Sequence, residues 1–188
     1  MTRLHEFRDE SMIIPTEFWL AYGAYLAWLL AGSADFICHW RTNLRNTSGV
    51  AESATHLIQL GLLAAAVVLG LTFEVGKSSA LLIGVLVIAH AVVGYVDTRI
   101  AFGRHRVVLP VEQHIHSVLD MAPLVAFAWL MTTTWPAATT AGWGLSLRQP
   151  GTPVIVWAAI LLPAALLCVG PALIEFRAAW KTARMSGI

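Results

Sequence analysis

Charged residues are scarce in this sequence. Asp, Glu, Lys and Arg together make up 12% of the 188 residues, whereas hydrophobic residues make up 57%. A typical soluble domain is about 25% charged, and the mean hydropathy of this chain is +0.70. The composition therefore excludes an ordinary soluble enzyme. It predicts that residues 1–188 form a single integral membrane domain surrounded by lipids.

Basic clusters and paired cysteines are also lacking. The formal net charge is only +1 and no basic stripe runs along the chain, so no nucleic-acid partner is expected. The two cysteines, Cys38 and Cys168, lie in apolar segments and do not form a zinc-binding spacing. We expect both to be small buried residues. No thiolate ligand is expected in any metal site.

No segment shows the alternation of apolar and polar residues that is typical of a membrane β-strand. Instead, five apolar stretches are long enough to cross a bilayer, which takes about 20 helical residues. Segments rich in turn-forming residues separate them. These features predict an all-α fold, a polytopic membrane helix bundle. Its five transmembrane helices are expected at about 15–40, 50–73, 79–102, 111–135 and 153–176.

Lys and Arg are unevenly divided between the two ends of the predicted bundle. The end that holds the first loop, the third loop and the C-terminus has eight of them, and the opposite end has four. The positive-inside rule then predicts a protein of the bacterial inner (cytoplasmic) membrane, with its N-terminus outside and its C-terminus in the cytoplasm. The eight are Arg41, Arg45, Arg99, Arg104, Arg106, Arg177, Lys181 and Arg184; the four are Arg3, Arg8, Lys77 and Arg148.

Four of the predicted helices each carry a carboxylate and a histidine on one face, because residues four or seven apart share a helix face. The up-and-down order of the helices places all four pairs near the cytoplasmic end. Ionisable groups inside a membrane are costly unless they are paired, hydrated or bound to metal. The pairs are Asp35 with His39, Glu52 with His56, His90 with Asp97, and Glu112 with His116.

The simplest common cause of four such pairs is a di-metal site surrounded by the first four helices. Helix bundles bind two metal ions through carboxylate and histidine side chains that project inward. Four carboxylates and four imidazoles are enough ligands for two ions, with Fe favoured and Zn or Mn as alternatives. Two other interpretations stay open: the pairs clasp helices together, or they form a proton relay.

Several further residues are candidates around this site. Asp120 continues the face of Glu112 and His116 by one more turn, and it is the candidate catalytic general base. Whether His114 or Glu175 joins the site is left open by the sequence. Arg106, like its neighbour Arg104, is interpreted mainly as a charge that sets membrane topology.

The segments ADFICHWRTNLRNTSGVAESATHL and VEQHIHSVLDMAP resemble a family of small bacterial integral membrane proteins. The shared patterns are D-x3-H, T-S-G-x2-E-S-x2-H-L and E-Q-H-x-H-S, and they span the first four helices. The resemblance implies a membrane bundle but no particular activity. A weaker similarity to membrane di-iron desaturases and hydroxylases, whose HxxHH clusters this chain lacks, implies only a class of reaction.

These observations favour a membrane-embedded di-iron oxidoreductase that acts on a lipid-like or other hydrophobic substrate, with electrons supplied by a separate donor. One alternative is a di-zinc membrane hydrolase, in which the ions activate water. Another is a protein that handles or transports metal. The outer halves of the predicted helices are nearly free of ionisable groups, which disfavours a transport path. The oligomeric state is left open.

Overall fold

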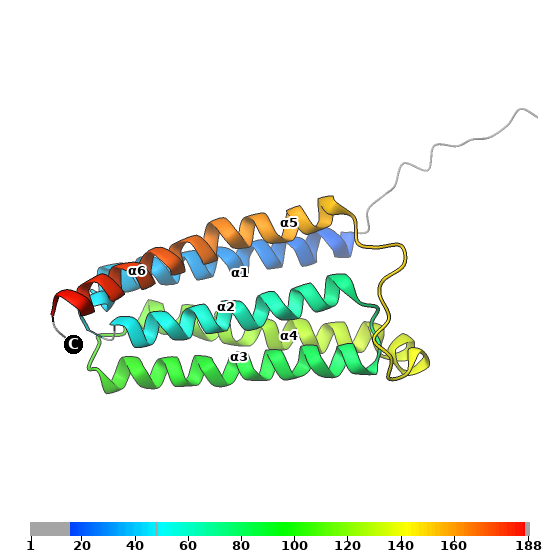
Figure 1. Cartoon of the computed structure of the whole chain (residues 1–188), viewed down its shortest axis with the longest axis horizontal. Helices are drawn as coiled ribbons and strands as arrows, with labels where there is room; N and C mark the ends of the chain where they lie inside the picture. Colours follow the sequence, from blue (N-terminus) through cyan, green and yellow to red (C-terminus); the bar gives the residue numbers. More distant parts are fainter. Residues whose placement is uncertain (1–15, 48, 187–188) are drawn as a thin grey trace, which may run out of the picture.

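The computed structural model describes residues 16–47 and 49–186 as a bundle of long helices (Figure 1). Five helical segments in this part of the chain are long and apolar enough to cross a membrane. No strand occurs within it beyond one isolated bridge between Phe73 and Leu147. The predicted all-α fold with five membrane-length helices is therefore confirmed. The spans are α1 (Thr16–Arg41), α2 (Gly49–Thr72), α3 (Lys77–Gly103), α4 (Pro110–Ala141) and a composite fifth span, Val154–Met185.

Most helix ends lie within two residues of the predicted ones, although the predicted start at Pro15 lies outside the described residues. Two ends were predicted too early. The fifth span continues beyond 176 to Met185, and the fourth helix continues beyond 135 to Ala141 in spite of Pro136. Inside a membrane no water is available to bind the backbone groups of an interrupted helix. The single backbone hydrogen bond lost at Pro136 therefore costs less free energy than the several that a loop would lose. The hydroxyls of Thr139 and Thr140 also donate hydrogen bonds to the Pro136 carbonyl, at 2.8 and 2.9 Å.

The fifth span is one continuous helix with a wide turn in its middle. It consists of α5 (Val154–Ala164), a π-helical turn η2 (Ala165–Val169) and α6 (Gly170–Met185). The π turn follows Pro163, which has no N–H to donate to the regular helical ladder. Cys168 in this turn is buried against Gly32 of α1, where an added Cβ would lie 2.9 Å from its sulfur. The two cysteines are both buried, as predicted.

The helices form a ring rather than a four-helix bundle with a fifth helix outside it. α1 packs against α4 and the fifth span, while α2 packs against α3 and α6. The fifth span therefore lies between α1 and α2, beside α1 along its length (Figure 1). The first four helices do not close the site by themselves. Because α6 completes the ring, its side chains can reach the space between α1 and α2.

The interior of the bundle has an apolar half and a polar half. Ala66, Ile83 and Val87 form the buried core of the apolar half, packed against partly buried neighbours from α2, α3 and α4. In this half, Phe127 of α4 approaches Gly84 of α3 so closely that an added Cβ would lie 2.9 Å from its ring. The polar half lies toward the loop between α1 and α2 and toward the C-terminus.

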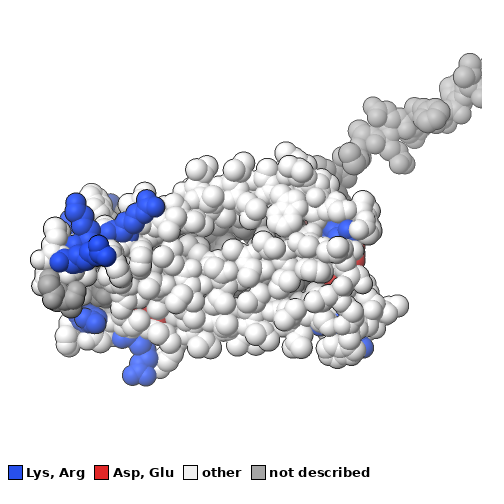
Figure 2. Space-filling model, in the orientation of Figure 1, with Lys and Arg blue, Asp and Glu red and all other residues white. Residues whose placement is uncertain are grey.

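On the face of the bundle that Figure 2 shows, the Lys and Arg side chains gather toward the two ends and leave a wide uncharged middle. The end near the C-terminus carries the denser group of Lys and Arg side chains (Figure 2). Arg3 and Arg8, which the orientation argument also counted, lie outside the described residues. The uncharged middle is compatible with an integral membrane protein.

Candidate metal centre

Five helices and one loop supply the polar half of the interior. α1 and α3 contribute their C-terminal ends, α2 and α4 contribute their N-terminal ends, and α6 contributes its N-terminal half. The i, i+4 pairs therefore point into one space. Each of these residues is at most 8% exposed: Asp35, His39, Glu52, His56, Asp97, Glu112 and His116. Buried His, Asp and Glu groups that could hold metal ions are thus present, in two main groups joined by Glu175.

The first group consists of Asp35 and His39 from α1 and Glu112 and His116 from α4. Nε2 of His116 lies 2.9 Å from one oxygen of Asp35, and Nε2 of His39 lies 3.2 Å from the other. The fourth member, Glu112, has an oxygen 3.7 Å from Nε2 of His39. One ligand atom from each of the four residues lies within 4.8 Å of all the others. Four inward-facing donors at this spacing match the ligand set of a single ion.

Three atoms of this first group have no hydrogen-bond partner. They are Oδ1 of Asp35, Nε2 of His39 and Nε2 of His116, and all three are buried. Each of these atoms lies close to a carboxylate oxygen or an imidazole nitrogen of another residue in the group, but the angles of these contacts do not suit hydrogen bonds. Buried polar atoms without partners are rare in proteins and usually indicate an ion or a water. Two ligands at right angles, each 2.0–2.2 Å from an ion, lie about 3 Å apart, which matches the 2.9 Å between Oδ1 of Asp35 and Nε2 of His116.

The second group consists of Glu52 and His56 from α2 and Asp97 from α3. Nε2 of His56 lies 3.2 Å from Oδ2 of Asp97, and the Thr55 hydroxyl bonds to the other oxygen of Asp97. Glu52 is fully buried at 0% exposure. The hydroxyl of Thr55 fixes the orientation of the Asp97 carboxylate and leaves Oδ2 facing His56.

Glu175 of α6 connects the two groups. Its carboxylate accepts hydrogen bonds from Nδ1 of His39 at 2.8 Å and from Nδ1 of His56 at 3.1 Å. The two imidazole rings are stacked 4.6 Å apart, and the ring of Phe36 meets both edge-on. When Nδ1 carries the proton, Nε2 has a free lone pair. Glu175 thus directs both Nε2 atoms toward the ligand groups, a role that the sequence left open.

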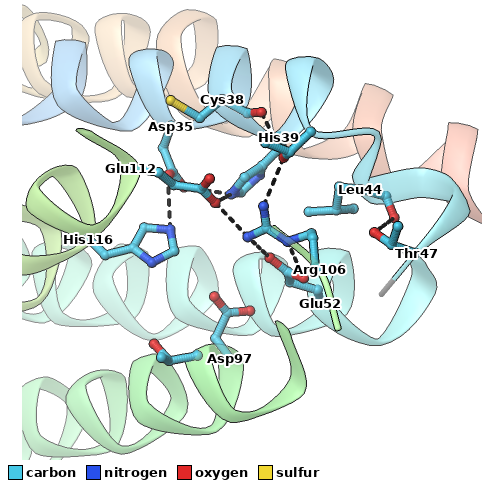
Figure 3. Close-up of polar contacts among 12 residues, drawn as sticks. Asp35, Cys38, His39, Leu44, Thr47, Glu52, Asp97, Arg106, Glu112 and His116 are labelled. Atoms are coloured by element: carbon cyan, nitrogen blue, oxygen red, sulfur yellow. Dashed lines mark hydrogen bonds and ion pairs between the residues drawn. The ribbon is translucent and has the colours of Figure 1, made fainter. Parts of the chain in front are cut away.

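Arg106 lies inside the site, which corrects its interpretation as a topology charge. Figure 3 shows its guanidinium between Glu52 and Glu112. Nη2 donates to an oxygen of each carboxylate at 2.5 Å, Nε donates to Glu52 at 3.0 Å, and Nη1 donates to Thr42 at 2.9 Å. Burial by itself would lower the pKa of Arg106, but the hydrogen bonds and charges of Glu112 and Glu52 outweigh it and raise the pKa. The guanidinium is a permanent cation of the site.

Sequence reasoning missed Arg106 because an arginine just beyond a membrane span usually faces the headgroups. Its neighbour Arg104 is exposed in this way. A short loop carries the chain back into the bundle, and Pro110 then begins α4. Glu112 accepts a hydrogen bond from the backbone N–H of Leu109 at 3.4 Å. The sequence contains no signal that separates Arg106 from Arg104.

His90, Asp120 and His114 stand apart from the two groups. His90 is buried at 3% exposure, but it does not belong to any ligand group among the described residues. Seven residues separate it from Asp97, which is about 10 Å along a helix axis and too far to share an ion. Asp120 lies beside Asp35, Asp97 and His116 at the edge of the site. His114 is exposed and faces away from it.

The charges of the site define what it can bind. Its five carboxylates, from Asp35, Glu52, Asp97, Glu112 and Glu175, would carry five negative charges when ionised, and Arg106 offsets one of them. Four negative charges would remain in a buried space, where uncompensated charge is very costly. Two divalent cations would offset all four negative charges. Protonation of the three imidazoles of the site, those of His39, His56 and His116, would offset only three.

The chain was compared with protein-family models, curated proteins and solved structures, and none of them matches it. The resemblance inferred from the sequence motifs therefore stays a prediction. The geometry of the buried groups is the basis of the functional interpretation.

Proposed function

We propose that this chain is a membrane-embedded di-metal protein, with one divalent cation in each of the two ligand groups. The observation that carries the proposal is the set of three buried ligand atoms, on Asp35, His39 and His116, that form no hydrogen bond. If the carboxylate and histidine pairs only held the helices together, these atoms would form hydrogen bonds. An ion at their common centre satisfies all three together.

The charge of the site supports two ions rather than one. A single divalent cation would offset two of the four negative charges that remain beside Arg106, and a second would offset the other two. The second group offers Glu52, His56 and Asp97 as ligands for another ion. Since Glu175 orients one histidine of each group, the two ions would lie in adjacent sites.

We further propose that the ions are iron and that the protein is an oxidoreductase. Mixed carboxylate and imidazole ligands suit Fe, Mn and Zn, and carboxylate-rich pairs inside helix bundles are typical of di-iron and di-manganese proteins. Two bound irons would supply redox chemistry with dioxygen or peroxide. The chain's own residues hold the ions, keep the site dry and compensate its charge. A lipid-like or other hydrophobic substrate is favoured because the site lies within the span region.

The apolar half of the bundle disfavours metal transport. A transported ion would have to pass Ala66, Ile83, Val87 and the ring of Phe127, which fill the interior beyond the site. None of these side chains offers a ligand. We place the site near the cytoplasmic face of the bacterial inner membrane, because the end that holds it carries the denser group of Lys and Arg.

Elemental analysis of protein purified in detergent without added metal tests the proposal. We expect about two ions per chain, and about half of that in His116→Ala and in Glu52→Gln, since each variant loses a ligand of one group. His114→Ala is the matched control, since His114 is exposed on the same helix. Unchanged metal content in both ligand variants would refute the site. Zinc in place of iron, with no response to reductant, would favour the hydrolase over the oxidoreductase.

A further inference from the structure

A small cavity lies beside the first ligand group, on the side away from Arg106. Asp35, Asp97 and His116 line it from the site, and Gln59, Asp120 and Gly94 line it from the other side. The space open to the centre of a water molecule is about 20 Å³. One water needs about 10–15 Å³ by this measure. The cavity therefore accommodates one water or a molecule of about two heavy atoms.

The walls of the cavity offer polar atoms that form no hydrogen bond. Oδ1 of Asp35 and Nε2 of His116 lie 2.9 Å apart without hydrogen-bond geometry, and both residues are buried. Across the cavity, the Gln59 amide and the Asp120 carboxylate make no hydrogen bond with any described residue. A molecule held there would find two to four polar partners, which is what an ordered buried water requires.

The size of the cavity is set by the contact between α3 and α4. Gly94 of α3 has no side chain, and the carboxylate of Asp120 occupies the place where a Cβ would be. A methyl group at position 94 would displace this carboxylate. Gly94 thus leaves room for Asp120, and Asp120 in turn limits the space in front of His116.

We propose that this cavity is the binding site for a small reactant of one or two heavy atoms, next to the ion held by Asp35, His39, Glu112 and His116. The proposal rests on the di-metal function and names the class of molecule that reaches the ion. Water, dioxygen and other diatomic molecules fit the cavity. A lipid-sized substrate does not fit it and must meet the site from another side.

Two ligands that bind iron through an N–O group but differ in size test the proposal. Nitric oxide has two heavy atoms and nitrosobenzene has eight, and both bind ferrous iron through nitrogen. We expect nitric oxide, but not nitrosobenzene, to change the visible absorption of the anaerobic, Fe(II)-loaded protein. An equal response to both ligands would overturn the size limit, and no response to nitric oxide at full iron content would overturn the binding site.

Two variants of the cavity lining test whether the response to nitric oxide depends on the cavity. In Gly94→Ala the displaced Asp120 carboxylate should weaken nitric oxide binding at least tenfold, while iron content stays unchanged. Asp120→Glu, whose side chain is one methylene longer, should weaken nitric oxide binding in the same way. This variant replaces Gly94→Ala in the test if Gly94→Ala does not fold. Gly61→Ala is the control, because nothing lies within 4 Å of a Cβ added there. Unchanged nitric oxide affinity in both cavity variants would refute the assignment.

A crystal structure of the metal-free protein separates this proposal from the di-metal function. We expect one ordered water within hydrogen-bond distance of both Gln59 and Asp120, whether or not the protein binds metal. A cavity without ordered solvent at high resolution would overturn the binding site. A chain that binds no iron but holds this water would refute the di-metal function alone.

Discussion

At the scale of single residues, Glu175 contacts one proposed ligand in each of the two groups. It accepts hydrogen bonds from His39 and His56, one histidine of each ligand group. Carboxylates that bind the second nitrogen of a metal-bound histidine fix its ring and raise its basicity, and their loss commonly costs 10–100-fold in metal affinity. One side chain on α6 therefore influences both proposed ions.

Glu175→Ala should lower metal affinity about 10–100-fold at both sites, because both imidazoles lose the partner that orients them. Glu175→Gln should cost less, since its amide oxygen still accepts a hydrogen bond from one imidazole. Competition with a chelator measures the affinities. Glu74→Gln, at an exposed position at the other end of the bundle, is the control. Loss of only one ion in Glu175→Ala would contradict the shared role.

Arg106 compensates charge whether or not metal is bound. It contacts Glu52 and Glu112, and all three side chains are buried at 0% exposure. Removal of one partner from a buried ion pair costs about 3–5 kcal/mol, because the other partner is left uncompensated. The cost should be largest when no metal ion neutralises the same carboxylates.

Arg106→Ala should therefore lower the free energy of unfolding of the metal-free protein by about 3–5 kcal/mol, and bound metal should recover part of this loss. Thermal unfolding in detergent, with and without metal, measures the difference. Arg104→Ala provides the comparison because Arg104 is exposed two residues away. Equal stability of the two variants would place Arg106 outside the buried charge network.

At the scale of elements, the fifth span determines whether α6 reaches the site. Gly32 of α1 allows the π-helical turn with Cys168 to approach, and Cys168 contacts the Leu29 carbonyl at 3.6 Å. The hydroxyl of Ser33 donates to the Leu167 carbonyl at 2.8 Å in the same region. These contacts lie about two turns from Glu175, so a shift of the turn moves Glu175 as well.

Gly32→Ala should destabilise the protein by about 1–3 kcal/mol, as overpacking does, and should also lower metal affinity through Glu175. The double variant Gly32→Ala with Cys168→Ala removes the clashing sulfur and should recover most of both losses. Gly23→Ala on the same helix is the control, since no atom lies within 4 Å of a Cβ there. Failure of the double variant to recover metal binding would mean that the turn does not position Glu175.

At the scale of the whole molecule, the proposed metal centre lies at the end of the bundle that carries the denser group of Lys and Arg, which Figure 2 shows. From the positive-inside rule we propose that this end lies in the cytoplasm. Under this proposal, an electron donor or soluble partner would reach the site from the cytoplasm. The opposite end is closed by contacts between the 142–152 loop and α2, where Arg148 donates to the Gly70 carbonyl at 3.0 Å.

A reporter protein fused after Ile188 should be active only in the cytoplasm, and one inserted at Gly151 should be active only outside. The physical reason is the retention of Lys and Arg on the cytoplasmic side. Replacing Arg177, Lys181 and Arg184 together by Gln should produce a mixture of orientations. Reporter activity in cells measures each fraction. The reverse pattern in the unchanged chain would place the metal centre at the outer face.

The sequence by itself determined the membrane-length helices and the pairs on their faces. Hydropathy and the helical period are local properties, so Asp35 and His39, or Glu112 and His116, are on one face wherever the helix lies. The same logic included His90, but seven residues along a helix placed it too deep to join the others. Only the tertiary structure decided that the fifth span lies between α1 and α2, which brings Glu175 to two histidines, and that the loop before α4 turns Arg106 inward. These positions depend on contacts between segments far apart in the chain, and neither hydropathy nor periodicity records such contacts.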